Sequence, residues 1–166
     1  MTAPAHALAA ATAQGLGVLA GIARHAFPKG PMEVLTSVEV TVEGGIHGDF
    51  RGVVRPGGKG KRQVTLMERI DWDAAMAELG HSIPWQERRV NLLVDGMDLP
   101  QTPGTRIVIG GVVLEVTVEC DPCSRMEAVA PGLMAALTPD WRGGACTRVK
   151  QGGNIAVGDV IRIEMP

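Results

Sequence analysis

Glycine and proline occur so often in this chain that they limit it to short regular elements. The 166 residues include 22 glycines and 11 prolines, and both residue types interrupt helices and strands. Between them lie short runs rich in β-branched residues, which favour strands. The predicted strands are 15–23, 34–42, 63–67, 90–94, a hairpin over 106–116, and a turn and final strand over 154–163. We therefore expect a mainly β (α+β) fold, a barrel with a few short helices rather than a doubly wound sheet.

Two helical segments are predicted between these strands. Residues 68–79 place apolar side chains near helical spacing and stop at Gly80, a residue type that commonly ends a helix. A second helix follows Cys123, breaks at residues 131–132 and resumes over 133–137. Residues 1–14 are rich in alanine and are predicted to be a short helix or a frayed terminus. A chain of this length is expected to form a single domain, with residues 1–32 leading into the barrel and residues 33–166 as its body.

The composition argues against several classes of partner. Sixteen basic and 18 acidic residues give a net charge of −2, which provides no general basic surface for nucleic acid. No apolar run reaches the ~18 residues of a membrane span. Three cysteines and the lack of a basic leader at the start favour a reducing, cytoplasmic location. Twelve of the 16 basic residues are arginine, which indicates either sites for phosphate and carboxylate or merely a gene of high GC content.

The segment from Cys120 to Cys123 holds the most informative chemistry of the sequence. A β-branched run over 112–118 precedes it, and Ser124 with Glu127 has the spacing of a helix capping box. Cys123 is therefore expected where a strand ends and a helix begins, a place that favours an anionic thiolate. The C-x-x-C spacing also permits a redox dithiol, half of a zinc site, or two buried structural cysteines. The spacing alone leaves these alternatives open.

Other polar clusters suggest an anion site less specifically. Arg88 and Arg89 precede the strand predicted to begin at residue 90, and strand alternation would place Arg89 and Asn91 on one face. Such arginines can grip phosphate, or they can pair in solvent with Glu87. Five basic residues lie among glycines from position 51 to position 62. This pattern is typical of an anion-binding loop, and equally of a mobile surface loop.

A short turn contains the pair His47 and Asp49, two residues apart. This spacing indicates acid–base chemistry only weakly. We interpret His47 as a turn residue whose side chain is satisfied by Asp49.

Taken together, these pieces resemble the MOSC family, the domain found at the C-terminus of molybdenum cofactor sulfurases. The resemblance extends over roughly residues 33–164. The segments on which it rests, in family order, are 45–49 (GIHGD), 62–66 (RQVTL), 89–92 (RVNL), and 123–125 (CSR) followed by 152–155 (GGNI) and 157–159 (VGD).

The resemblance implies a pyruvate-kinase-like β-barrel that binds a molybdenum–pterin cofactor (molybdopterin). In family members that reduce N-hydroxylated compounds a cysteine ligates molybdenum, and Cys123 matches that cysteine by position. Arg89 and Asn91 would then hold the phosphate and the pterin ring. Arg62, Thr65 and Arg125 are further cofactor-binding candidates by the same resemblance.

Three functions follow from the resemblance as expectations. The first is reduction of N-hydroxylated or N-oxide compounds, with electrons from a donor protein. The second is sulfur transfer through a Cys123 persulfide, for sulfuration of a cofactor or a metal–sulfur cluster, with sulfur from a cysteine desulfurase, an enzyme that depends on pyridoxal phosphate. The third is a non-catalytic binding or scaffold module.

Overall fold

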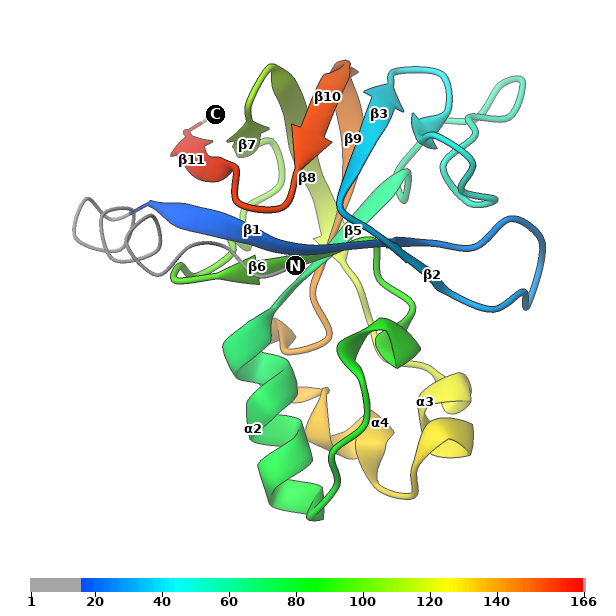
Figure 1. The fold of residues 1–166 in the computed structure, drawn as a ribbon, viewed down its shortest axis with the longest axis vertical. Coiled ribbons are helices and arrows are strands. Elements are labelled where there is room, and N and C mark those ends of the chain that lie inside the picture. Colours follow the sequence, from blue (N-terminus) through cyan, green and yellow to red (C-terminus); the bar gives the residue numbers. More distant parts are fainter. Residues whose placement is uncertain (1–15, 166) are drawn as a thin grey trace.

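The computed structural model describes residues 16–165, and seven of its strands close into a barrel, which Figure 1 shows above the helices. Around the barrel each strand pairs with the next, and β11 pairs with β1 to close the ring. The pair β5–β6 is parallel, and the other barrel pairs are antiparallel. In ring order the strands are β1 (Gly17–Arg24), β11 (Val160–Glu164), β7 (Arg106–Ile109), β8 (Val112–Glu119), β9 (Ala145–Gln151), β5 (Val64–Glu68) and β6 (Leu92–Asp95). The expected mainly β barrel fold is confirmed.

A small second sheet lies against one end of the barrel. It orders β10 (Gly153–Ala156), β3 (Ser37–Thr41) and β4 (Gly45–Ile46). The strand predicted over 34–42 is in fact two strands, because the chain changes sheets at Thr36: β2 (Glu33–Leu35) pairs with β1, whereas β3 pairs with β10 and β4.

The helices gather at the opposite end of the barrel (Figure 1). They are α2 (Arg69–Leu79), the 3₁₀ turn η1 (Trp85–Arg88), α3 (Ser124–Val129), α4 (Leu133–Ala136) and the 3₁₀ turn η2 (Pro139–Trp141). Helix α2 ends at Gly80 in the left-handed conformation, as the sequence predicts. None of the described helices is long and apolar enough to cross a membrane.

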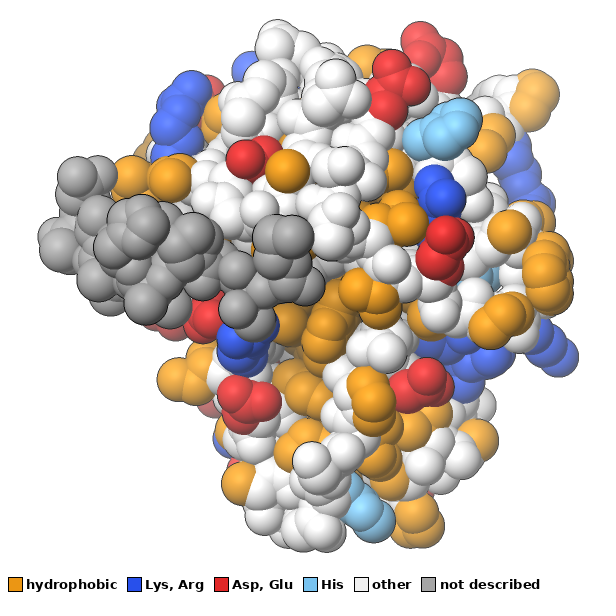
Figure 2. Space-filling view, viewed as in Figure 1, with side chains coloured by type: hydrophobic (Ala, Val, Ile, Leu, Met, Phe, Trp, Pro, Cys, Tyr) orange, Lys and Arg blue, Asp and Glu red, His pale blue; other side chains and the backbone are white. Residues whose placement is uncertain are grey.

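Two hydrophobic clusters hold these layers together. The first fills the barrel with aliphatic side chains such as Leu19, Leu66 and Ile107. The second lies between the barrel and the helices, and includes Trp72 from α2, Met126 from α3 and Cys146 from β9. In Figure 2 hydrophobic side chains run down the waist between barrel and helices, and basic side chains gather at the right edge beside the β1–β2 loop.

The structure differs from the sequence prediction at β9 and at the start of β6. Strand β9 was not predicted, although it pairs with β8 on one side and β5 on the other. The predicted strand over 90–94 begins at Leu92, because η1 and a left-handed residue occupy the positions before it. Strand β1 belongs to the segment 1–32 and is an integral strand of the barrel. The prediction for residues 1–14 falls outside the described residues.

Candidate functional site

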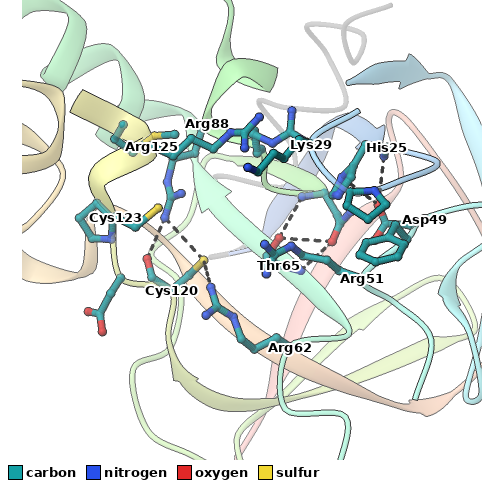
Figure 3. Close-up of a pocket in the computed structure, with 17 residues that line it drawn as sticks. His25, Lys29, Asp49, Arg51, Arg62, Thr65, Arg88, Cys120, Cys123 and Arg125 are labelled. Carbon is teal, nitrogen blue, oxygen red and sulfur yellow. Dashed lines mark hydrogen bonds and ion pairs between the residues drawn. The ribbon is translucent and has the colours of Figure 1, made fainter. Parts of the chain in front are cut away.

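A cavity of about 480 Å³ lies where the barrel meets the helices (Figure 3). This volume falls in the range of small-molecule and cofactor sites. Six basic side chains line the cavity, against two carboxylates, so its interior favours an anion. The basic residues are Lys29, Arg51, Arg62, Arg88, Arg89 and Arg125.

The structure brings all of the sequence-predicted site residues to this one cavity. Cys123, Arg62, Thr65, Arg89, Asn91 and Arg125 line it. They come from the end of the loop before β5, from β5 itself, from the segment between η1 and β6, and from the start of α3. Sequence reasoning did not select Arg88, Arg51, His25 or Cys120 as site residues, although they line the same cavity.

Cys123 is an exposed free thiol at the first position before α3. Its backbone is extended, with φ −120° and ψ 178°, and no side chain caps the helix. The capping box predicted from Ser124 and Glu127 is therefore wrong, because the helix begins one residue earlier than that box requires. Glu127 instead accepts hydrogen bonds from the backbone N–H groups of Gly132 and Met134, at 3.2 and 3.0 Å, and so fixes the start of α4.

Arg88 is buried and holds three parts of the site together. Its Nη2 donates to the carbonyl oxygens of Cys120 and Gly143, both at 2.8 Å, and its Nε donates to Gly143 O at 3.2 Å. The alternative of a solvated arginine paired with Glu87 is therefore wrong for Arg88: its side chain points into the protein, because η1 turns the chain before β6 begins.

Arg89 takes an unusual backbone conformation at the same turn. Its φ is +68°, in the left-handed region that non-glycine residues rarely adopt. Strand alternation with Asn91 does not apply, because Arg89 caps η1 and strand β6 starts only at Leu92. Burial lowers the pKa of the Arg89 guanidinium, and the nearby Arg125 and Arg51 guanidiniums lower it further. All three of these cations line the cavity.

Asn91 and Thr65 tie strands β5, β6 and β1 together beside the cavity. The Asn91 Oδ1 accepts from Thr65 N at 3.1 Å and from Thr65 Oγ1 at 3.2 Å, and Asn91 Nδ2 donates to Ala23 O at 3.1 Å. Asn91 is buried. Its amide therefore already has partners within the barrel, and contact with a pterin ring stays a prediction.

Cys120 is buried at the floor of the cavity, between two arginines. Its Sγ lies 3.5 Å from Arg88 Nη2 and 3.9 Å from Arg62 Nη2 (Figure 3). The neighbouring Cys146 thiol lowers the pKa of Cys120 to about 6; burial opposes this and the two guanidiniums reinforce it. The neighbouring Cys120 and burial raise the pKa of Cys146, whose Sγ donates to the carbonyl oxygen of Glu119 at 3.8 Å. Cys120 is therefore the thiolate of the pair.

His25 and Asp49 form a buried pair on the other side of the cavity (Figure 3). Asp49 Oδ1 accepts from the His25 backbone N–H at 3.1 Å and lies 3.6 Å from His25 Nδ1. Asp49 therefore lies against His25 and not the nearby His47, which corrects the sequence interpretation, although its only hydrogen bond to His25 is from the backbone N–H and His25 Nδ1 has no hydrogen-bond partner within the described part of the chain. The Gly48–Asp49 turn marked Asp49 in the sequence. It did not indicate which histidine contacts the carboxylate, because His25 lies in a different loop.

The thiols and cations thus provide the chemistry that the cavity offers. Among residues 16–165, no three His, Cys, Asp or Glu side chains are placed to hold a metal ion together. The cavity instead combines one exposed thiol, Cys123, with a buried thiolate and several guanidiniums. Thiolates are ligands for soft metals and nucleophiles toward electrophiles, and guanidiniums bind phosphate through paired N–H groups.

The fold and site define a small β-barrel protein with an arginine-lined, cysteine-containing anion pocket at the helical end of the barrel. The model of the MOSC domain matches residues 43–162, and the chain belongs to the MOSC domain family.

Solved structures share the fold across most of the chain. YuaD from Bacillus subtilis is 19% identical, with a TM-score of 0.74 over 91% of this chain and 97% of that one. YiiM from Geobacillus stearothermophilus is 16% identical, with a TM-score of 0.66 over 89% and 75%. YiiM from Escherichia coli is 13% identical, with a TM-score of 0.63 over 88% and 69%. No curated protein sequence matches the chain.

Proposed function

We propose that this protein binds a molybdenum–pterin cofactor in the arginine-lined cavity and reduces N-hydroxylated or N-oxide compounds. The observation that supports this most is the position of Cys123, an exposed thiol on the wall of a cavity that five arginines line. A metal site of this kind needs one soft protein ligand and cations for the phosphate of the pterin.

The residues of the cavity fit such a group. Cys123 would ligate molybdenum as a thiolate. The guanidiniums of Arg51, Arg89 and Arg125, which all line the cavity, would bind the phosphate, because a bound anion would offset the burial and the neighbouring positive charges that lower the pKa of Arg89. The cavity volume of about 480 Å³ also suits a cofactor. When bound, the cofactor would supply the redox centre that accepts and passes on electrons.

The chain's own residues would position that centre and its substrate. Thr65 and Asn91 hold strands β5 and β6 in register beneath the cavity. The buried Arg88 fixes the backbone at Cys120 and Gly143, and so fixes the segment that leads to Cys123. Exposure of Cys123 leaves room for substrate beside it. Electrons would come from a separate donor protein.

Elemental analysis of protein purified from its native source tests the proposal. We expect molybdenum in near-stoichiometric amount in the wild type and a loss of it in Cys123→Ser. Ser124→Ala is the matched control, because Ser124 is exposed and neighbours Cys123 in the chain. Retention of molybdenum by Cys123→Ser would contradict the assignment of Cys123 as the ligand.

A sulfur carrier is the second candidate function. The exposed, unpaired Cys123 thiol favours it, because a carrier cysteine must meet a donor such as a cysteine desulfurase. Mass spectrometry separates the two functions: one added sulfur atom on Cys123 in protein that holds no molybdenum favours the carrier. Native protein with neither molybdenum nor added sulfur would favour a binding or scaffold module.

A further inference from the structure

Two loops on one side of the molecule expose apolar side chains. Phe27 is 56% exposed and Phe50 is 39% exposed, and they are the only two phenylalanines in the chain. Phenylalanine is among the residue types that proteins bury most often, yet neither of these side chains is in the hydrophobic core. Val53, in the same loop as Phe50, is 60% exposed. Both loops, one between β1 and β2 and one between β4 and β5, project to the right in Figure 1.

A hydrogen bond and a shared hollow hold the two loops side by side. The Phe50 backbone N–H donates to His25 O at 2.8 Å. Ala26 from the first loop borders the same surface hollow as Phe50 and Val53 from the second. The apolar tips therefore belong to one continuous surface, which we call the loop face. It consists of the exposed side chains of residues 26–30 and 50–61.

The charge of the loop face has a single sign. Neither residues 25–32 nor residues 50–67 include an acidic residue. Among residues 16–165, none of the exposed cations of the loop face forms an ion pair, whereas five cations elsewhere in the chain each pair with a carboxylate. Because the whole chain has a net charge of −2, its free positive charge is concentrated on this side. The exposed cations are Lys29, Arg51, Arg55, Lys59 and Lys61.

We propose that the loop face binds the anionic surface of a lipid bilayer. Phe27, Phe50 and Val53 enter the boundary between headgroups and acyl chains, where apolar and aromatic side chains gain from burial. The cations around them contact the phosphates of anionic lipids, which attract exposed Lys and Arg side chains. The chain lies on the bilayer and does not cross it. Binding uses exposed side chains, so it needs neither an empty cavity nor any particular ligand on Cys123.

The loop face fits a bilayer better than an acidic protein or a nucleic acid. Residues 50–61 include four glycines and form neither helix nor strand, so their cations are not held at a fixed spacing. A protein partner requires a surface of matching shape, whereas lipid headgroups accept cations at any spacing. Single-stranded nucleic acids stack their bases on aromatic rings, but Val53, the most exposed of the three apolar residues, has no ring.

The experiment measures cosedimentation of the full chain with two kinds of vesicle. One kind is phosphatidylcholine with added phosphatidylglycerol, which is anionic, and the other is phosphatidylcholine alone. The test variants are Phe27→Ser and the double variant Arg55→Gln with Lys59→Gln. These residues are exposed and lie outside the cavity residues, so the variants should fold normally and keep the molybdenum content of the wild type. Failure of the proposed reductase function therefore leaves this test unaffected.

Each test variant has a matched control at another place on the surface. Ile70→Ser is the control for Phe27→Ser, because Ile70 on α2 is an apolar residue that is 69% exposed. Arg106→Gln with Arg162→Gln removes the same two charges as the double test variant. These two arginines are exposed on β7 and β11, at the left of the barrel in Figure 1 and opposite to the two loops.

We expect the wild type to bind the anionic vesicles, more weakly as salt is added, and to bind phosphatidylcholine alone far less. Each cation near an anionic bilayer strengthens binding about fivefold, so Arg55→Gln with Lys59→Gln should bind about 25-fold more weakly. Phe27→Ser should bind about fivefold more weakly, because it loses the exposed part of an aromatic side chain that the bilayer would bury. The two controls should bind as the wild type does.

Three results would overturn the inference. The first is a wild type that does not sediment with the anionic vesicles at low salt, including one that binds polyglutamate or a single-stranded oligonucleotide instead. The second is a loss of vesicle binding that is as large in the controls as in the test variants. The third is unchanged binding of Phe27→Ser, which would show that the apolar tips do not enter the bilayer.

Discussion

Asp49 lies 3.6 Å from His25, carboxylate oxygen Oδ1 to imidazole Nδ1, and both side chains are buried beside the cavity. The two residues come from different loops, one after β1 and one after β4. Asp49 Oδ1 also accepts the backbone N–H of His25 at 3.1 Å. This contact fastens the β1–β2 loop, which contributes Lys29 to the cavity, onto the loop that contributes Arg51.

The His25–Asp49 pair predicts a pH-dependent contribution to stability. Burial lowers the pKa of His25 below its usual 6.5, and Asp49 only partly offsets this. The unfolded chain therefore binds the proton on His25 more readily than the folded chain does. The contribution of neutral His25 to stability is fully present above pH 6.5 and is lost as pH falls below it. In urea unfolding, His25→Gln should lower the free energy of unfolding less at pH 5 than at pH 8. Asp49→Asn should increase the loss of unfolding free energy between pH 8 and pH 5. If His25→Gln lowers the free energy of unfolding equally at both pH values, the stability does not depend on the protonation of His25.

Glu68 predicts the opposite dependence. Burial raises the pKa of Glu68 to about 7, and the hydrogen bond from Leu99 N, at 3.1 Å, opposes this. A carboxyl whose pKa is raised on folding favours the folded state at low pH, and this contribution is lost as pH rises from about 4.5 to 7. Glu68→Gln keeps an acceptor for Leu99 and should stabilise the protein by about 1–3 kcal/mol at pH 8, with little effect at pH 4. Glu43→Gln is the control, because Glu43 is exposed. Equal changes in the free energy of unfolding for the two substitutions at pH 8 would refute the assignment of a raised pKa to Glu68.

Arg88 and Arg89 should behave differently although they are adjacent. Arg88→Met leaves two buried carbonyls and the Cys120 thiolate without their donor, and should cost about 3–5 kcal/mol. Arg89→Gly removes a side chain from a residue at φ +68°, where glycine is unstrained. The free energy of unfolding of the Arg89→Gly variant should be unchanged or slightly higher, whereas its retention of the proposed cofactor should fall. Denaturant midpoints and molybdenum content measure the two effects; a large loss of stability in Arg89→Gly would contradict this division.

Gly144 should tolerate no side chain. Its φ is +110°, and a Cβ there would collide with the backbone carbonyl oxygen of Leu66 on the neighbouring strand β5. Gly144→Ala should therefore cost about 3 kcal/mol or more. Gly111→Ala is the control, because a Cβ at Gly111 meets nothing within 4 Å, and its effect should stay within about 0.5 kcal/mol. Thermal melting of the two variants compares them directly, and similar melting temperatures would show that β9 can move away from β5.

Strand β9 was missed by sequence reasoning because its own residues carry no strand pattern. The run Ala145–Gln151 mixes small, polar and charged residues, and so lacks the apolar alternation of a half-buried strand. The strand forms because β8 and β5 offer hydrogen-bonding partners on both of its edges. Neither partner is near it in the chain, so local pattern could not reveal it.

The sequence by itself determined the elements whose signals are local: short β-branched strands, the stop of α2 at Gly80, and a cysteine at the junction before α3. It also indicated Arg62, Arg89 and Cys123 as residues of one site. Only the tertiary structure decided which groups face one another. It paired His25 with Asp49, buried Arg88 against Cys120, and gave the cavity its thiolate, because burial and charge pairing depend on segments that are distant in the chain.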